Sequence, residues 1–154
     1  MDDSWAPVLR VGGRTYPVDI HFEENDSQSN YERTAELKVL ELHKSTPHTN
    51  MALRQNYDIL VFLTQADEVD RLVNKLQAQL TDCVCVPLHG SLERDEQRRA
   101  FEVVSAPFVR KIVVATNIAE TSVTIDGIGI VIDTGLAKQV GSNSCYLNHH
   151  LILK

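Results

Sequence analysis

Residues Asp58–Leu63 read Asp-Ile-Leu-Val-Phe-Leu, and this stretch decides the fold of the chain. A short, unbroken apolar run is typical of a strand buried on both faces of a parallel sheet. A helix is expected to follow it, capped by Thr64 with Asp67 in the capping-box position. The apolar face of that helix repeats at helical spacing through Val69, Leu72, Val73, Leu76 and Leu80.

The alternation of strands and helices continues toward the C-terminus. We expect a helix over residues 92–104 and a short polar helical turn over 117–122. The strands expected around them are Cys83–Leu88, Lys111–Ala115 and Ile128–Asp133. Strands that alternate with helices form a parallel sheet with helical crossovers, so we predict an α/β fold with flanking helices.

The pattern upstream of this region is less regular. Two short β-rich runs, Val8–Val11 and Val18–Phe22, come first, and a polar loop leads from them to a helix capped by Asn30. Residues 44–57 show no period and are expected to form a loop. The helix is indicated by the spacing of Ala35, Val39 and Leu42.

Composition and charge exclude several classes of protein. The 154 residues are 43% hydrophobic and 23% charged, as in ordinary globular domains. No apolar run approaches the roughly 18 residues of a membrane span, so no membrane partner is expected. The net charge of −6 lacks the strongly basic balance of a dedicated nucleic-acid module. Three cysteines indicate reduced thiols in a nuclear or cytoplasmic protein.

Polar residues crowd the segment that follows Lys111–Ala115. Residues 116–127 read Thr-Asn-Ile-Ala-Glu-Thr-Ser-Val-Thr-Ile-Asp-Gly. Parallel α/β folds bind their ligands at the carboxyl ends of strands. A capped strand-to-helix turn explains these residues as well as a ligand site does. A helix N-terminus at this place could instead bind phosphate oxygens through its backbone N–H groups.

Four stretches together resemble the DEAH-box (RNA helicase A-like) branch of superfamily 2 helicases. Residues 115–127 are similar to motif V, residues 58–64 to motif IV, and residues 87–92 with the following Phe101 to motif IVa. Residues 11–19 resemble the strand pair that closes the first RecA-like domain. The resemblance implies a RecA-like parallel sheet of the P-loop NTPase type, namely the second helicase domain, present here incompletely.

The resemblance implies a nucleotide-binding role for four residues. Phe101 matches the aromatic residue on which adenine stacks, and a core phenylalanine at a helix end is the alternative. Thr124 and Asp126 match the positions that hold the ribose, although an aspartate before Gly127 is also a turn signal. Ser122 matches a hydroxyl near the γ-phosphate.

Four further residues match positions that grip the backbone of single-stranded RNA. Contacts of this kind position the strand and carry no sequence information. They use hydroxyls and backbone amides, so an acidic domain can still make them. For the glycine among them, a simple strand-to-helix turn is the alternative. The four residues are Gly90, Ser91, Thr116 and Asn117.

No metal ligands are expected in this chain. Cys83 and Cys85 share a strand face, but they lack a second cysteine pair or a partner histidine, so they are expected to be buried thiols. The acidic run Asp67–Asp70 lies within the helical pattern rather than at a strand end. We therefore expect it to be a solvated helix face and not a Mg²⁺ site.

Groups that phosphoryl transfer requires are missing from the sequence. It contains no GxxxxGKS or GxxxxGKT phosphate loop, no DEAH after a strand, and no motif VI. ATP and Mg²⁺ would therefore act in the intact enzyme, and the chain alone is expected not to hydrolyse ATP. No catalytic residue is assigned. Gln65 stands where the family usually has glycine, which puts the loop geometry there in question.

We interpret the chain as a fragment of an ATP-dependent RNA helicase. Residues 1–22 are expected to be the tail of the first RecA-like domain, 23–57 a linker with one helix, 58–140 a truncated second RecA-like domain, and 141–154 an unaligned tail. The partners that the resemblance implies are the missing first RecA-like domain, single-stranded RNA, and spliceosomal or other ribonucleoprotein proteins.

Two other functions stand against this interpretation. One is a non-catalytic RNA- or protein-binding product without ATPase activity of its own, which a genuine start at Met1 would favour. The other is an unrelated nucleotide enzyme such as a dehydrogenase, which the absence of GxGxxG disfavours. The reading frame upstream discriminates between the helicase fragment and the non-catalytic binding product, because a phosphate loop and a DEAH motif encoded before Met1 would indicate an enzyme fragment.

Overall fold

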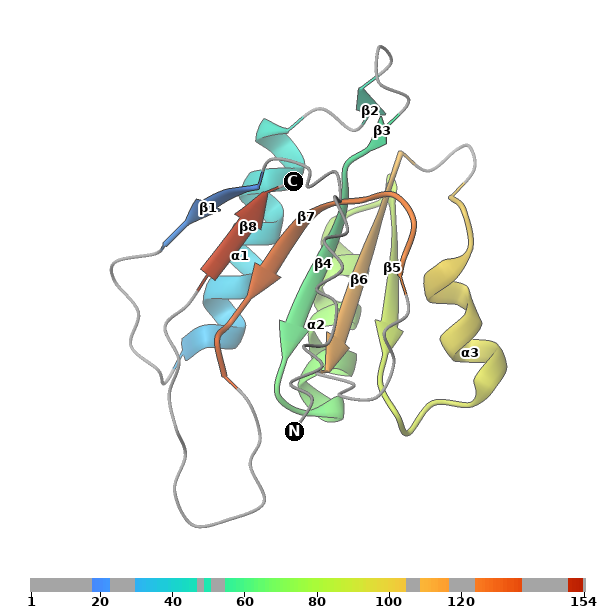
Figure 1. The fold of residues 1–154 in the computed structure, drawn as a ribbon. Helices are drawn as coiled ribbons and strands as arrows, with labels where there is room; N and C mark the ends of the chain where they lie inside the picture. The colour runs from blue at the N-terminus through green and yellow to red at the C-terminus, as the bar shows by residue number, and fades with distance from the viewer. Residues whose placement is uncertain are drawn as a thin grey trace, which may run out of the picture.

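A single central sheet organises the structure, a computed structural model, in the strand order β1-β8-β7-β4-β6-β5 (Figure 1). Four neighbouring strands of this sheet run parallel: β4 (Asp58–Leu63), β5 (Cys83–Leu88), β6 (Arg110–Thr116) and β7 (Ile128–Asp133). The predicted α/β fold with a parallel sheet is therefore confirmed. The residues that the structure describes are 18–22, 30–46, 49–50, 55–104, 109–116, 124–136 and 150–153.

The bounds of the parallel strands agree closely with the sequence prediction. Strands β4, β5 and β7 begin and end where predicted, and β6 is longer by Arg110 at its start and Thr116 at its end. Strand β4 lies between β6 and β7, so both of its edges are paired. This central position explains its unbroken apolar run, because side chains on both faces of such a strand pack against other elements.

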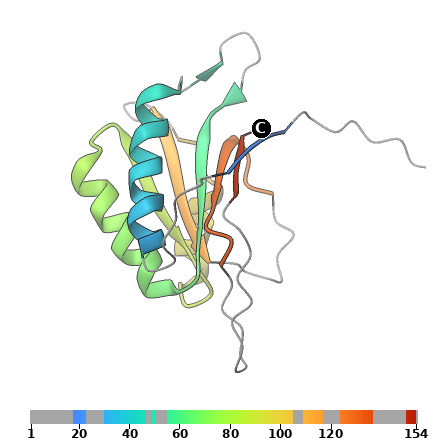
Figure 2. The same cartoon turned by 90° about the vertical axis from the view of Figure 1, so that its left-hand side faces the viewer.

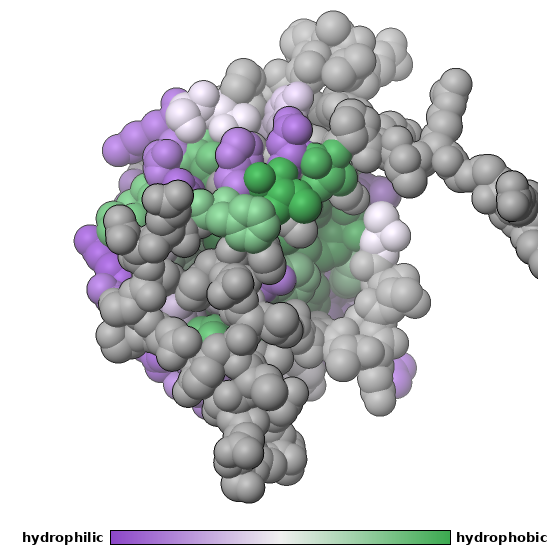
Figure 3. Space-filling model, turned by 60° about the vertical axis from the view of Figure 1, so that its left-hand side comes forward, coloured by the Kyte–Doolittle hydropathy of each residue, from purple (hydrophilic) through white to green (hydrophobic). Residues whose placement is uncertain are grey.

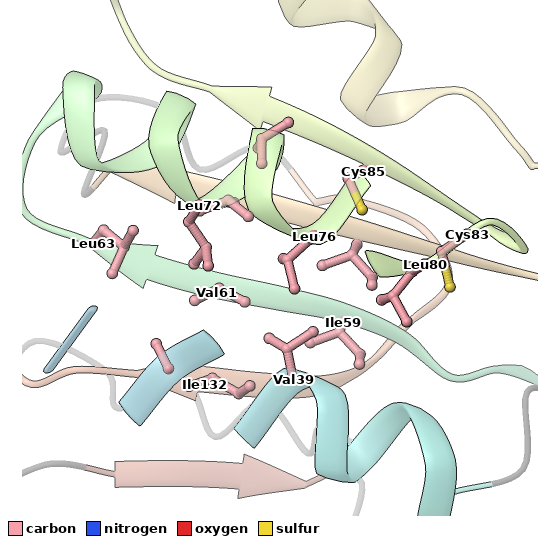
Figure 4. Packing of buried hydrophobic residues seen from close by; sticks show 14 of the residues in the cluster. Val39, Ile59, Val61, Leu63, Leu72, Leu76, Leu80, Cys83, Cys85 and Ile132 are labelled. Atoms are coloured by element: carbon pink, nitrogen blue, oxygen red, sulfur yellow. The ribbon is translucent and has the colours of Figure 1, made fainter. Parts of the chain in front are cut away.

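Two helices, α1 (Tyr31–Ser45) and α2 (Ala66–Gln79), lie side by side on one face of the sheet (Figure 2). Helix α1 begins after Asn30, as predicted, and the predicted apolar faces of both helices are buried. They pack on strand side chains such as Ile59 and Val61, which are fully buried (Figure 4). Burying one such aliphatic side chain contributes about 1.5–3 kcal/mol to folding.

The start of α2 differs from the prediction. Its N-cap is Gln65 and not Thr64, and the capping carboxylate is Glu68 and not Asp67. The Oε2 atom of Glu68 accepts hydrogen bonds from the backbone N–H groups of Thr64 and Gln65, both at 3.1 Å. The backbone of Gln65 is extended, with φ −135° and ψ 150°, which any residue can adopt. This loop therefore does not require glycine.

The opposite face of the sheet carries a shorter crossover than predicted. In place of a helix over 92–104, the structure has α3 (Arg94–Arg98) followed by one 3₁₀ turn, η2 (Arg99–Phe101). The chain leaves the helical conformation at Glu102, whose backbone is extended. Beneath this crossover lies a second apolar cluster, which consists of Val86, Leu88, Ala100, Val113 and Ala115.

Two adjacent cations at the start of β6 bind the elements on the two faces of the sheet, α1 on one face and the α3 crossover on the other. Arg110 and Lys111 are buried, and because side chains alternate along a strand, they point to opposite faces. The guanidinium of Arg110 donates to the carbonyl oxygens of Leu42 and Thr46 at the end of α1, at 3.3 and 3.0 Å. A cation at a helix C-terminus also interacts favourably with the helix dipole.

One predicted loop contains structure that the sequence did not indicate. Within residues 44–57, α1 continues to Ser45, and β2 (Thr49–Asn50) pairs with β3 (Gln55–Asn56) in an antiparallel hairpin. The prediction of a loop over this range is therefore wrong. Strands of two residues leave no alternation in the sequence to detect.

Two antiparallel strands extend the sheet beyond β7. Strand β8 (His150–Leu153) pairs with β7, and β1 (Asp19–His21) pairs with β8. The side chains of Val18, Ile20 and Phe22 around β1 are exposed, and Figure 3 shows apolar surface on this side of the molecule. The assignment of residues 1–22 to another domain stays a prediction, and the predicted strand Val8–Val11 lies outside the described residues.

Candidate functional site

The predicted ligand-binding residues divide between the two ends of the parallel strands. Gly90 and Ser91 follow β5, and Thr116 ends β6, so these residues lie at the carboxyl edge of the sheet. Thr124 and Asp126 precede β7, and Phe101 precedes β6, which places them at the amino edge. Two further predicted residues, Asn117 and Ser122, lie outside the residues that the structure describes.

At the amino edge, Phe101 and Ile125 pack on the same apolar cluster. Both side chains are half-buried, and both contact the cluster beneath the α3 crossover. This position combines the two interpretations of Phe101. One part of its ring belongs to the core, and the part that stays accessible can stack on a planar group.

Lys111 connects the residues at the amino edge. Its ammonium group donates to the carbonyl oxygens of Ala100 and Glu102, both at 2.9 Å, and these two residues flank Phe101. Burial lowers the pKa of Lys111, whereas the negative charges of Asp58, Asp126 and Glu102 act in the opposite direction. Lys111 therefore fixes the turn that carries Phe101.

Sequence reasoning did not assign a function to Lys111. The available signal is the pair Arg110-Lys111 at the start of a strand that is otherwise apolar. Long basic side chains within a buried strand need acceptors, because an unpaired buried charge is costly. The sequence alone does not indicate which carbonyl groups supply them.

The turn before β7 presents Thr124 and Asp126 to solvent. Gly127 has φ 87°, a left-handed conformation that favours glycine, and its carbonyl oxygen accepts a hydrogen bond from the N–H of Asp58 at 3.1 Å. Gly127 thus meets the conformational demand of the turn. Asp126 is exposed, and within the described part of the chain no hydrogen bond occupies its carboxylate, which leaves it able to accept from sugar hydroxyls.

At the carboxyl edge, Gly90 leaves the backbone accessible. A Cβ atom added at Gly90 would have no heavy atom within 4 Å, and the glycines with positive φ in the described residues are Gly127 and Gly135. Neither space nor conformation therefore requires glycine at residue 90. The absence of a side chain there allows another molecule to approach the backbone N–H groups.

A buried histidine supports this turn from behind. His89 Nε2 lies 3.2 Å from Asp70 Oδ1, and the carbonyl oxygen of His89 accepts from the N–H of Leu92 at 3.2 Å. Ser91 is exposed next to it, and Thr116 is half-buried at the end of β6. The carboxyl edge thus presents hydroxyls and backbone amides, which suit phosphate oxygens.

The carboxylate of Glu68 forms a network of hydrogen bonds at the carboxyl end of β4. Besides the two backbone N–H groups, the carboxylate of Glu68 accepts from the Thr64 hydroxyl at 2.8 Å and from the hydroxyl of Tyr31. The predicted solvated face over Asp67–Asp70 is therefore correct for the two exposed aspartates and wrong for Glu68, which is buried. This network ties α1 to α2 and leaves Glu68 no free oxygen for a metal ion.

The cysteines differ from the prediction in one respect. Cys83 and Cys85 are buried free thiols, as predicted. However, Cys83 does have a histidine neighbour, because its Sγ atom lies 3.4 Å from Nδ1 of His43 at the end of α1. These residues are far apart in the sequence, so only the packing of α1 on the sheet brings them together.

Within the described residues, no helix has the length and apolar character needed to cross a membrane.

Comparison with known proteins gives concordant matches. The model of the helicase conserved C-terminal domain family matches residues 38–149. A solved structure of the DExH-box NTPase HrpB of Escherichia coli is similar to this chain with a TM-score of 0.61 and 27% sequence identity, over 82% of this chain and 15% of that one. A structure described as the DEAH/RHA helicase HrpB of Escherichia coli is similar with a TM-score of 0.60 and 27% sequence identity, over 83% of this chain and 15% of that one. The chain thus spans about 15% of the length of these proteins.

Proposed function

We propose that this chain supplies the ATP- and RNA-contacting surfaces of an ATP-dependent RNA helicase. The proposal starts from the fact that the chain belongs to the helicase conserved C-terminal domain family and to its DEAH-box branch. The amino edge of the sheet would bind the adenosine part of ATP. The carboxyl edge would bind the backbone of single-stranded RNA. ATP, Mg²⁺ and the first RecA-like domain would complete the machinery in the intact enzyme.

The observation that carries this proposal is that Lys111 fixes the turn carrying Phe101 at the same edge of the sheet as Asp126. Lys111 holds the carbonyl groups on both sides of Phe101, and Asp126 is exposed just before β7. Adenine would stack on the accessible part of Phe101, and the ribose hydroxyls would donate to Asp126 with Thr124 beside it. The contacts of Lys111 with the turn of Phe101 and of Asp58 with Gly127 support a site that is partly organised before a ligand arrives.

The accessible backbone at Gly90 supports RNA binding at the other edge. Neither the fold nor the φ angle of Gly90 excludes a side chain, so the glycine itself suggests close approach by a ligand. Ser91, Thr116 and Asn117 would add hydroxyl and amide contacts to the phosphates. Because these contacts avoid base edges, we expect little sequence preference.

Without the phosphate loop and the DEAH carboxylates, the chain itself would bind and not hydrolyse. The second candidate function, a non-catalytic RNA- or protein-binding product, would therefore use the same two edges of the sheet. Partners among spliceosomal or other ribonucleoprotein proteins, in the nucleus or the cytoplasm, belong to this proposal. RNA-stimulated ATP turnover by the purified 154-residue chain would contradict it.

The nucleotide site can be tested by titrating ADP into the ¹⁵N-labelled chain and following amide chemical shifts. We expect shifts around Phe101 and residues 124–126. Phe101→Leu should weaken ADP binding about 5- to 150-fold, because base–aromatic stacking contributes about 1–3 kcal/mol. The matched control is Phe62→Leu, which changes a phenylalanine that packs on the same cluster from β4. Equal weakening by both substitutions, or no shifts at all, would refute adenine binding at Phe101.

A further inference from the structure

Three chemically different side chains meet where α1 ends and β5 begins. They are His43 in the last turn of α1, Asp82, and Cys83 at the start of β5. The Sγ atom of Cys83 lies 3.4 Å from Nδ1 and 4.0 Å from Nε2 of His43, and 3.7 Å from Oδ1 of Asp82. The same carboxylate oxygen lies 3.4 Å from Nε2 of His43. Figure 4 shows Cys83 beside Leu80 at the margin of the core.

These distances fit a tetrahedral metal ion. Zinc binds sulfur at about 2.3 Å and nitrogen or oxygen at about 2.0–2.2 Å, so its ligand atoms lie about 3.3–3.7 Å apart. The observed separations run from 3.4 to 4.0 Å. The two 3.4 Å contacts of His43 use different nitrogens, Nδ1 toward Cys83 and Nε2 toward Asp82, so binding of one ion would require the imidazole to reorient.

A hydrogen bond between thiol and imidazole does not account for the whole arrangement. It explains the contact between Cys83 and His43. Asp82, with 49% of its side chain exposed, closes the triangle from the solvent side, where its carboxylate accepts from the Cys83 thiol and lies within ion-pair distance of His43. Nitrogen, sulfur and oxygen donors in one cluster are a ligand set that zinc accepts. Asp82 also supplies the side from which an ion could enter.

The charges around the cluster act on a divalent cation in both directions, because Asp82 attracts it and the guanidinium of Arg110 repels it. Burial, with the charge of Asp82, raises the pKa of Cys83 to about 12, so the thiol is neutral in the absence of metal. The guanidinium of Arg110 acts in the opposite direction and favours the thiolate. A bound cation deprotonates a coordinating thiol. The thiolate and the carboxylate together would then balance the two charges of the ion.

We propose that His43, Asp82 and Cys83 form a binding site for a divalent cation of the zinc type, with water in the fourth position. The site lies on the α1/α2 face of the sheet, whereas Phe101 lies on the other face, so it does not depend on the proposed nucleotide site. Its physical effect would be to join the end of α1 to the start of β5. Sequence reasoning missed it because His43 and Cys83 are far apart in the sequence and only the packing of α1 brings them together.

Cobalt(II) tests the proposal directly, because a thiolate–cobalt bond gives a near-ultraviolet charge-transfer band and tetrahedral cobalt gives strong visible bands. We expect the full chain to show both, and Zn²⁺ to displace the cobalt. Cys83→Ser should abolish the charge-transfer band and weaken Zn²⁺ binding at least about tenfold. The matched control is Cys85→Ser, which changes a second buried thiol whose pKa burial also raises to about 12 but which lies outside the cluster.

A second measurement keeps the proposal open to refutation if Cys83→Ser does not fold. Zn²⁺ should raise the melting temperature of the unmodified chain and of Cys85→Ser, and should raise that of Asp82→Asn much less. Asp82 is partly exposed, so its substitution leaves the core intact. A charge-transfer band that survives in Cys83→Ser, an unchanged Zn²⁺ affinity in Asp82→Asn, or the absence of any band in the folded chain would overturn the proposal.

Discussion

The two edges of the parallel sheet are built in different ways. At the amino edge, buried charges satisfy backbone carbonyls, and Lys111 holds both neighbours of Phe101. At the carboxyl edge, the backbone around Gly90 is exposed and no side chain is needed there. The comparison shows that one edge is organised by internal contacts, whereas the other leaves hydrogen-bonding groups for another molecule. A substitution at the amino edge should therefore lower stability, whereas a substitution at the carboxyl edge should weaken binding with little change in stability.

The largest expected effect is at the buried cations. Lys111→Met and Arg110→Met each leave two carbonyl groups without their cationic donor, so each should lower the free energy of unfolding by about 2–4 kcal/mol, measured by urea denaturation. Only Lys111→Met should also weaken ADP binding, because Arg110 faces α1. Equal loss of ADP affinity in both variants would show that the effect is general destabilisation.

A smaller effect is expected at two glycines with different roles. Gly90→Ala should change the free energy of unfolding by less than about 0.5 kcal/mol, while weakening the binding of single-stranded RNA several-fold. Gly127→Ala should destabilise the chain by about 1–2 kcal/mol, because its φ of 87° is unfavourable for alanine. Thermal melts and fluorescence anisotropy with a labelled oligonucleotide measure the two quantities. If RNA binds Gly90→Ala as tightly as the original chain, the carboxyl edge is not the RNA surface.

The smallest effect concerns the pH dependence of stability at Asp58. Burial raises the pKa of this carboxyl, although the N–H of Lys111 donates to it at 2.8 Å and lowers it in part. The folded state therefore favours the protonated form, and the contribution of Asp58 to stability declines as the pH rises above its ordinary pKa of 3.8. Asp58→Asn should gain stability relative to the original chain over that range, by less than about 1 kcal/mol. A difference between the two chains that does not vary with pH would contradict this.

The sequence predicted the elements that depend on local pattern. Strands β4, β5 and β7 were correct because buried parallel strands are continuous apolar runs bounded by polar residues. The helix after β5 was predicted too long, since the apolar spacing over 92–104 does not show that the chain becomes extended at Glu102, next to the carbonyl groups that Lys111 contacts. The two-residue strands β2 and β3 carry no period at all.

The candidate site was predictable only in part, for a similar reason. The resemblance indicated Phe101, Asp126 and Gly90, but the division of these residues between two edges follows from the order of the strands. Lys111 and the neighbours His43 and Cys83 depend on contacts between segments distant in the sequence. No local pattern encodes which carbonyl or thiol a buried charge will meet.

The pair Arg110-Lys111 also has a consequence for folding. If β6 slipped by one residue against β4 or β5, each long cation would move to the opposite face of the sheet, away from the carbonyl groups that now accept its hydrogen bonds. An apolar strand tolerates such an error more easily, because one aliphatic side chain can replace another. Two neighbouring charges with different acceptors thus favour the observed register of β6 over a register shifted by one residue.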